Sequence, residues 1–142
     1  MEKILIYTDG GARGNPGPAG AGWVIYDGSP SAGSGRLLAE SKKYLGPVQT
    51  NNWAEYEAVA LALLEAKKLG LSGRGLEVRM DSKLVVEQLS GNWKIKEPTL
   101  KPQAAKVRVL LADFPKNKFV YVPREENAEA DRLVNEAIDE AT

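Results

Sequence analysis

The sequence predicts an α/β fold in which a five-stranded mixed sheet is flanked by helices. First, three short β-rich segments follow one another before residue 47 with no helix between them, which favours antiparallel hairpins. Second, two further β-rich segments alternate with helical patterns, which is typical of parallel crossover units. Third, a length of 142 residues suits one hydrophobic core, so residues 1–142 are predicted to form a single domain.

The three antiparallel strands are expected between residues 3 and 46. Residues 3–9, KILIYTD, form a short apolar run that is rich in β-formers. Glycine and proline then dominate residues 10–22, which predicts a flexible loop. The strand pattern resumes in residues 20–27, GAGWVIYD, and after a turn over 27–35 a third strand covers 35–46.

Helices and strands alternate in the rest of the chain. Residues 50–70 give the clearest helix pattern, with Asn51 or Asn52 as its cap and Gly70 at its end. A strand over 76–81 is followed by a short helix that Gly91 stops. The chain then continues with an irregular basic stretch (92–102), an amphipathic helix (103–114), a strand (118–122) and a last helix (128–141) capped by Asn127.

Composition limits the chemistry that the chain can perform. It contains no cysteine and no histidine, which excludes disulfides, thiolate metal sites and the commonest general base. A bound metal would need oxygen ligands, which favours magnesium, manganese or calcium over zinc. No secretory signal pattern and no long apolar run occur, so we expect a cytoplasmic monomer that does not bind a membrane.

Four acidic residues fall at the ends of predicted elements. Asp9 and Asp81 each end a strand, Glu55 lies in the first turn of the main helix, and Asp131 lies near the start of the last helix. Taken singly, such residues are usually turn formers or partners of the helix dipole. Strand ends and the starts of following helices meet at one edge of a parallel sheet, and clustered carboxylates need cations. Together the four residues predict a site for hard metal ions.

Charge is unevenly distributed along a chain whose formal net charge is zero. Residues 94–118 carry seven basic side chains against two acidic ones, and residues 119–142 carry two basic against seven acidic. This pattern is compatible with a surface for a polyanion beside a metal site. Complementary solvated faces are the alternative.

Four motifs, in this order and spacing, resemble the type 1 ribonuclease H family: TDGGARGNPGPAGAG, TNNWAEYEAVALAL, VRMDSKLVVEQLSG and NAEADRLVNEA. The resemblance covers nearly the whole chain. It implies the ribonuclease H fold and an endonuclease that hydrolyses the RNA strand of RNA–DNA hybrids with two Mg²⁺ ions, or Mn²⁺, leaving 5′-phosphate and 3′-hydroxyl ends. It also implies that the active site, which binds the metal, consists of Asp9, Glu55, Asp81 and Asp131.

The resemblance further implies how the substrate is held. The glycine loop would let the backbone approach a nucleic acid, and amides and hydroxyls would read the 2′-hydroxyls of the RNA strand. Asn51 has a second interpretation, because it can also cap a helix. The basic segment 94–118 would face the phosphates of the DNA strand. The predicted substrate-binding residues are Gly10, Gly11, Ala12, Arg13, Asn15, Thr50, Asn51, Asn52, Ser82, Trp93 and Arg124.

The chain departs from the family pattern in two places. Many relatives carry a histidine in the loop before the last aspartate, where this chain has VPREENAEAD. Arg124, Glu125 or Glu126 could replace it in product release, or the loop could simply be solvated. KIKEPTLKP is also too short and proline-rich for the basic helical protrusion of some members. We therefore expect a compact form that lacks both features.

Three other functions remain as alternatives. A non-catalytic nucleic-acid binder is disfavoured because all four acidic residues are intact. A DNA nuclease, such as an integrase or resolvase core, is disfavoured by the candidate readers of 2′-hydroxyls. An enzyme acting on small phosphate compounds is disfavoured because the glycine-rich segment lacks the lysine of a P-loop and leads into a strand.

Overall fold

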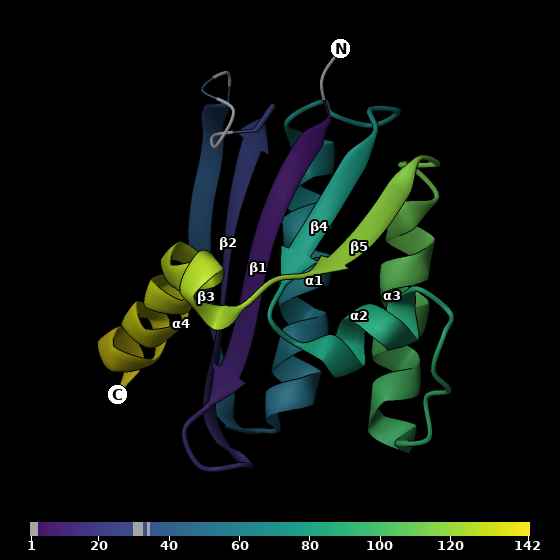
Figure 1. The fold of residues 1–142 in the computed structure, drawn as a ribbon. Coiled ribbons are helices and arrows are strands. Elements are labelled where there is room, and N and C mark those ends of the chain that lie inside the picture. Colours follow the sequence, from purple (N-terminus) through teal and green to yellow (C-terminus); the bar gives the residue numbers. More distant parts are fainter. Residues whose placement is uncertain (1–2, 30–32, 34) are drawn as a thin grey trace.

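The computed structural model describes residues 3–29, 33 and 35–142 and confirms the predicted sheet (Figure 1). Five strands lie in the order β3-β2-β1-β4-β5. β1 pairs antiparallel with β2, and β2 with β3, whereas β4 runs parallel to both β1 and β5. The strands are β1 (Ile4–Ala12), β2 (Gly17–Asp27), β3 (Arg36–Gln49), β4 (Leu76–Met80) and β5 (Asn117–Tyr121).

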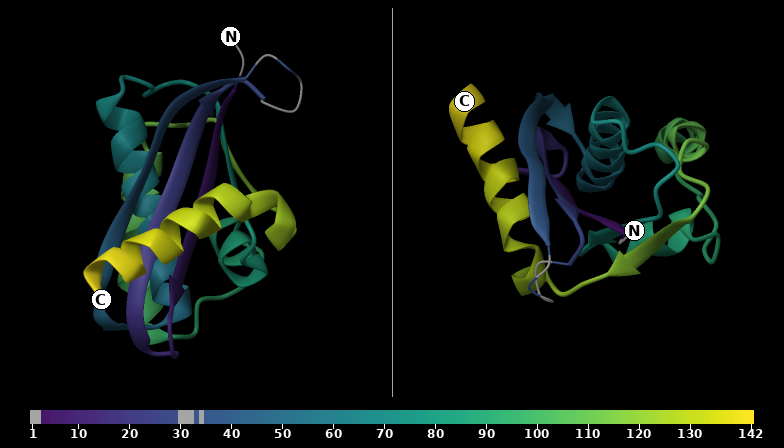
Figure 2. Two further views of the ribbon diagram at one scale, coloured as in Figure 1. Left: turned by 90° about the vertical axis from the view of Figure 1, so that its left-hand side faces the viewer. Right: turned by 90° about the horizontal axis from the view of Figure 1, so that it is seen from above.

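Helices cover both faces of the sheet (Figure 2). α1 packs on β1 and β2 from one face, with α3 behind it, and α4 packs on β2 and β3 from the other face. The main core lies between the sheet and α1, where Ile4, Ile6, Tyr56 and Leu63 are fully buried. The helices are α1 (Asn51–Lys68), α2 (Lys83–Leu89), α3 (Lys101–Leu111) and α4 (Ala128–Ala141), with short 3-10 turns at Pro98–Leu100 and Arg124–Asn127.

The predicted glycine loop is mostly strand, and this prediction was wrong. β1 continues to Ala12, with Gly10 and Gly11 paired to Ala21 and Gly20 of β2, so that only residues 13–16 connect the two strands. The glycines serve close packing instead. A Cβ atom on Gly10 would lie 2.1 Å from the carbonyl oxygen of Ala54 in α1.

The same holds on the other face of the sheet, where a Cβ atom on Gly22 would lie 2.5 Å from the carbonyl oxygen of Ala130 in α4. Glycine in β1 and β2 thus lets helices approach from both sides. Most of these positions were predicted as loop because glycine has a low propensity for β-strands.

Helix starts also differ from the prediction. Thr50, rather than Asn51 or Asn52, is the N-cap of α1, and its side chain accepts a hydrogen bond from the backbone N–H of Trp53. α3 begins two residues earlier than predicted, at Lys101. Gly70 and Gly91 follow α1 and α2 with φ of 79° and 83°, the left-handed conformation that commonly ends a helix. Residues 30–32 and 34 of the predicted turn lie outside the described part of the chain.

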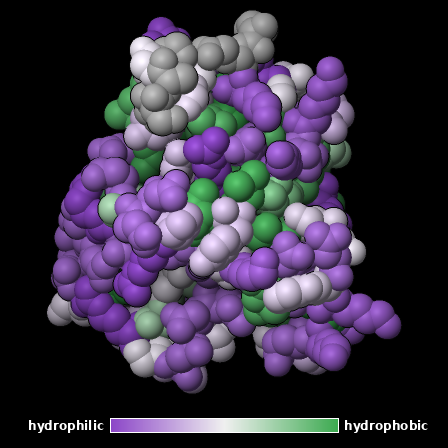
Figure 3. Space-filling model, in the orientation of Figure 1, coloured by the Kyte–Doolittle hydropathy of each residue, from purple (hydrophilic) through white to green (hydrophobic). Residues whose placement is uncertain are grey.

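The face seen in Figure 1 is largely hydrophilic. In the space-filling view, apolar residues show only as separate patches between hydrophilic ones (Figure 3). Within the described residues, no helix combines the length and the apolar character that crossing a membrane requires.

Candidate active site

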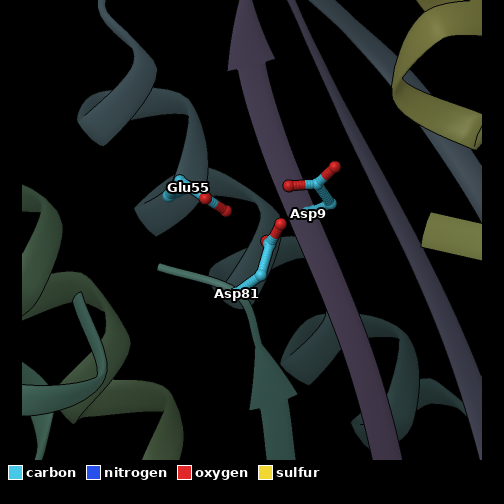
Figure 4. Close-up of side chains that lie close together, drawn as sticks. All are labelled: Asp9, Glu55 and Asp81. Carbon is cyan, nitrogen blue, oxygen red and sulfur yellow. The ribbon is translucent and has the colours of Figure 1, made fainter. Parts of the chain in front are cut away.

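Three of the four predicted acidic residues converge at one edge of the sheet (Figure 4). β1 and β4 are parallel neighbours, so Asp9, late in β1, and Asp81, directly after β4, lie side by side. α1 crosses the same edge and contributes Glu55 from its second turn, not from the first turn as predicted. Carboxylate oxygens of the three residues all lie within 4.8 Å of one another.

Glu55 is held by the backbone of β1. The N–H of Gly10 donates a hydrogen bond of 2.9 Å to Oε1 of Glu55, a contact that the close approach of α1 permits. Asp9 and Glu55 are 7% and 8% exposed, whereas Asp81 is half-buried. The cluster is therefore largely shielded from water but open on the side of Asp81.

The electrostatics of the cluster favour bound cations. Burial, together with the charges of Asp81 and Asp131, raises the pKa of Asp9 to about 8. Burial, followed by the charge of Asp9, likewise raises the pKa of Glu55 well above its ordinary value. A divalent cation would offset this repulsion, and a donor set of carboxylate oxygens alone fits a hard ion such as Mg²⁺ or Mn²⁺.

Asp131 reaches the site from the opposite face of the sheet. It lies in the first turn of α4, outside the group of three converging carboxylates but in the same hollow of about 400 Å³. Its charge contributes to the raised pKa of Asp9. Arg124 stands beside it, with Nη2 3.8 Å from Oδ1 of Asp131. The structure thus brings all four predicted acidic residues to one hollow.

Most of the predicted substrate-binding residues line the hollow that holds the carboxylates. Several of them are bonded to one another: Asn51 accepts a hydrogen bond of 2.7 Å from the N–H of Ala12 and donates its own N–H to Asn15 at 3.0 Å. The Ser82 hydroxyl caps α2. Those that line the hollow are Gly10, Gly11, Ala12, Arg13, Asn51, Ser82 and Arg124.

Asn52 and Trp93 lie in a second hollow of about 600 Å³, together with Lys94 and Lys96. Trp93 is 45% exposed, so it is a surface residue and not part of the core. Because Asn51 lines the first hollow and the next residue lines the second, the start of α1 separates the two.

The basic segment 94–118 does not form one surface. Lys106 forms an ion pair with Glu57 of α1, and Arg108 donates to the backbone oxygen of Gln88. Lys116 and Lys118 line a hollow with Lys3, at the start of β1 and β4 and therefore at the edge opposite the carboxylates. The prediction that the whole segment faces DNA phosphates is thus wrong, because its strand and helix distribute the lysines over different sides.

The loop before Asp131 contributes side chains to two different hollows. Arg124 lines the carboxylate hollow, but Glu125 and Glu126 line a different hollow, beside Tyr7 and Tyr26. The contacts of Asn127 were not predicted from the sequence. Its Nδ2 donates to the backbone oxygen of Thr8 and to Asp81 instead of capping α4. A polar residue four positions before an active-site aspartate is the only sequence signal that could have indicated it.

Comparisons with known proteins agree with this geometry. The family described as reverse transcriptase-like matches residues 7–137. Ribonuclease H1 of Halobacterium salinarum superposes with a TM-score of 0.88 at 40% identity, over 97% of this chain and 98% of that one. LC11-ribonuclease H1, isolated from compost and solved with an RNA/DNA hybrid, superposes with a TM-score of 0.88 at 52% identity, over 98% and 99%.

Among curated proteins, a bifunctional protein of Mycobacterium tuberculosis is 46% identical over 139 residues, which is 98% of this chain but 36% of that protein. The chain thus spans about a third of the length of the first curated relatives that it matches. Its own residues are matched nearly end to end by ribonucleases H1. The chain belongs to the family described as reverse transcriptase-like and to the type 1 ribonucleases H.

Proposed function

We propose that the chain is a metal-dependent endonuclease that hydrolyses the RNA strand of RNA–DNA hybrids and leaves 5′-phosphate and 3′-hydroxyl ends. The observation that carries this proposal is the convergence of Asp9, Glu55 and Asp81 within 4.8 Å, with Asp131 in the same hollow. The hybrid bound by LC11-ribonuclease H1, which is 52% identical, supports the same substrate here.

Each acidic residue has a part in binding two divalent ions. Asp9, Glu55 and Asp81 would hold the ions from β1, α1 and the end of β4, and Asp131 would complete the ligand set from the α4 side of the hollow. Two such ions supply an activated water and stabilise the attacking and leaving oxygens of a phosphodiester. The carboxylates would hold the ions in fixed positions, because all four residues stand on regular elements or directly beside them.

The start of α1 and the end of β1 are suited to reading 2′-hydroxyls. Ala12, Asn15 and Asn51 form a hydrogen-bonded group at the carboxylate hollow. Asn51 uses its Oδ1 and its backbone N–H within this group, which leaves its Nδ2 donor for the RNA strand. The backbone of Gly10–Ala12 and the Thr50 side chain extend this row of polar groups.

The second hollow is suited to the DNA strand. Trp93 offers an exposed aromatic face, and Lys94 and Lys96 add positive charge beside it. Phosphate contacts of this kind give affinity and salt dependence rather than sequence preference. Asn52 stands in this hollow, so its replacement by alanine is expected to weaken binding and cleavage of the hybrid.

The compact form without the loop histidine is part of the proposal. Arg124 is the basic residue of the loop that stands at the hollow, so it would hold a phosphate of the cut strand and let the product leave. The alternative role for Glu125 and Glu126, which is to draw the metal away, has less support because they line a different hollow. We also propose that the protein acts as a monomer, since the carboxylate hollow is complete within one chain, and that it works in the cytoplasm.

The decisive experiment is a cleavage assay on a labelled RNA–DNA hybrid, an RNA duplex and a DNA duplex, each with and without Mg²⁺. Cleavage of the RNA strand of the hybrid only in the presence of Mg²⁺, and its loss in Asp9→Asn, is the expected result. Binding of hybrid without cleavage would favour a non-catalytic binder. Cleavage of the DNA duplex at a similar rate would favour a DNA nuclease. Retention of near-full activity by Asp9→Asn would refute the assignment of the active site.

A further inference from the structure

The side chain of Asn127 points into the protein instead of serving the helix that it precedes. The residue occupies the N-cap position of α4, yet its side chain makes no cap hydrogen bond. Its Nδ2 donates to the backbone oxygen of Thr8 at 2.8 Å and to Oδ1 of Asp81 at 3.4 Å. Asn127 is 1% exposed, so these bonds are made away from bulk water.

The chemistry of the two partners fixes the orientation of the amide. A backbone carbonyl and a carboxylate are both acceptors, so only the NH₂ group can face them. The amide oxygen then faces elsewhere, and within the described residues it has no hydrogen-bond partner. Asn127 is therefore used as a double donor. A helix N-cap needs the opposite, an oxygen that accepts from free backbone N–H groups.

The two bonds join the segments that carry three of the acidic residues. Thr8 directly precedes Asp9 in β1, and Asp81 receives the second bond itself. Asn127 leads into α4, which carries Asp131 in its first turn. One buried amide thus connects strand β1, the end of β4 and the start of α4.

Asp81 needs such a restraint because it faces two other carboxylates within 4.8 Å. It is also the most exposed of these three, so repulsion would turn it toward solvent before a metal binds. A neutral donor can fix one of its oxygens without removing its charge, which leaves the second oxygen for the ion. We propose that Asn127 is a positioning residue that holds Asp81 in the geometry that binds Mg²⁺.

This inference rests on the proposed function, because it presupposes metal binding by the cluster. The test is a Mg²⁺ titration followed by the melting temperature, without substrate, on the parent and on Asn127→Ala. Removing a hydrogen-bond partner of a metal-ligating group typically lowers metal affinity by about 10- to 100-fold. We expect the Mg²⁺ concentration at the midpoint of stabilisation to rise by at least about tenfold.

Asn117→Ala is the matched control. Asn117 also donates its Nδ2 to a backbone oxygen, that of Phe114, at 2.8 Å, but it does so at the start of β5 and far from the carboxylates. This variant should melt at a lower temperature with an unchanged Mg²⁺ midpoint. A parent-like midpoint in Asn127→Ala would overturn the inference and leave the proposed function intact. A parent without any Mg²⁺ response would overturn the proposed function, and this inference with it.

A measurement on the unmodified protein covers the case in which Asn127→Ala does not fold. The side-chain NH₂ resonances of Asn127, assigned by NMR, should shift during a Mg²⁺ titration because Asp81, their acceptor, engages the ion. The NH₂ resonances of Asn117 should stay in place. Asn127 resonances that do not move at saturating Mg²⁺ would contradict the proposed role, since a purely structural bond to Thr8 would behave in that way.

Discussion

Asp9 makes the metal-free protein less stable as the pH rises, and Asp9→Asn should remove this effect. Burial and neighbouring charges raise the pKa of Asp9 from 3.8 to about 8 in the folded state. Between these values the carboxyl group is protonated in the folded protein and ionised in the unfolded chain. Unfolding then releases a proton, so the free energy of unfolding falls as the pH increases through this window.

The size of the effect follows from the shift. One pKa unit corresponds to about 1.4 kcal/mol, so between pH 3.8 and pH 7 the destabilisation reaches about 4 kcal/mol. Asparagine has nearly the same shape and does not ionise. Asp9→Asn should therefore be about 4 kcal/mol more stable than the parent at pH 7, roughly 12 °C in melting temperature for a domain of this size. Near pH 4 the two proteins should be equally stable.

The assay is urea unfolding in EDTA, followed by circular dichroism, at several values between pH 4 and pH 8. Asp139→Asn serves as the control, because Asp139 is exposed and its pKa is lowered by the bond from Arg13. This control should be slightly less stable than the parent at pH 7, so its change in stability should be opposite in sign to that of Asp9→Asn. A parent whose stability in EDTA is constant or increases from pH 5 to pH 8 would refute the reasoning.

Three further predictions concern the metal, the packing and the loop. Mg²⁺ at 100 times its dissociation constant should stabilise the parent by about 2.7 kcal/mol in urea unfolding, and Asp9→Asn by clearly less. Gly10→Ala should destabilise the protein by at least about 2 kcal/mol, because the new Cβ would meet the Ala54 oxygen at 2.1 Å, whereas Gly75→Ala, with no neighbour closer than 3.9 Å, should be nearly neutral. Arg124→Ala should raise the Michaelis constant for hybrid and reduce the slope of log affinity against log salt by about one, and a parent-like slope would exclude a phosphate contact.

The sequence predicted well those helices and strands whose residue pattern lies within the element itself. The last helix, 128–141, matches α4 at both ends, because its apolar residues recur at helical spacing. The four acidic residues were found from their positions at element ends, since chain order and parallel pairing determine which ends meet. The packing roles of Gly10 and Gly22 were not predicted, because they depend on helices that pack against the sheet from both faces.

Side-chain partners were the least predictable part of the site. Asn127 has the sequence position of a helix cap, and nothing nearby in the chain contradicts that role. Its actual partner in β1 lies 119 residues away, so the hydrogen bond exists only once the sheet has formed. The prediction of a single basic surface for residues 94–118 was wrong for a similar reason. The shared positive charge of these lysines does not indicate which side of the fold each one reaches.

The glycine contacts determine which parts of this protein can change without harm to the site. The carboxylates come from β1, α1, the end of β4 and α4, and the spacing between α1 and α4 is fixed by backbone contacts at Gly10 and Gly22. The connection of residues 69–75, at the opposite edge of the sheet, makes neither of these contacts, so a change in its length would leave that spacing in place. Substitution of either glycine, in contrast, would move a whole helix and displace a carboxylate that is itself unchanged. A variant with all four acidic residues intact could therefore still lose the geometry of the metal site.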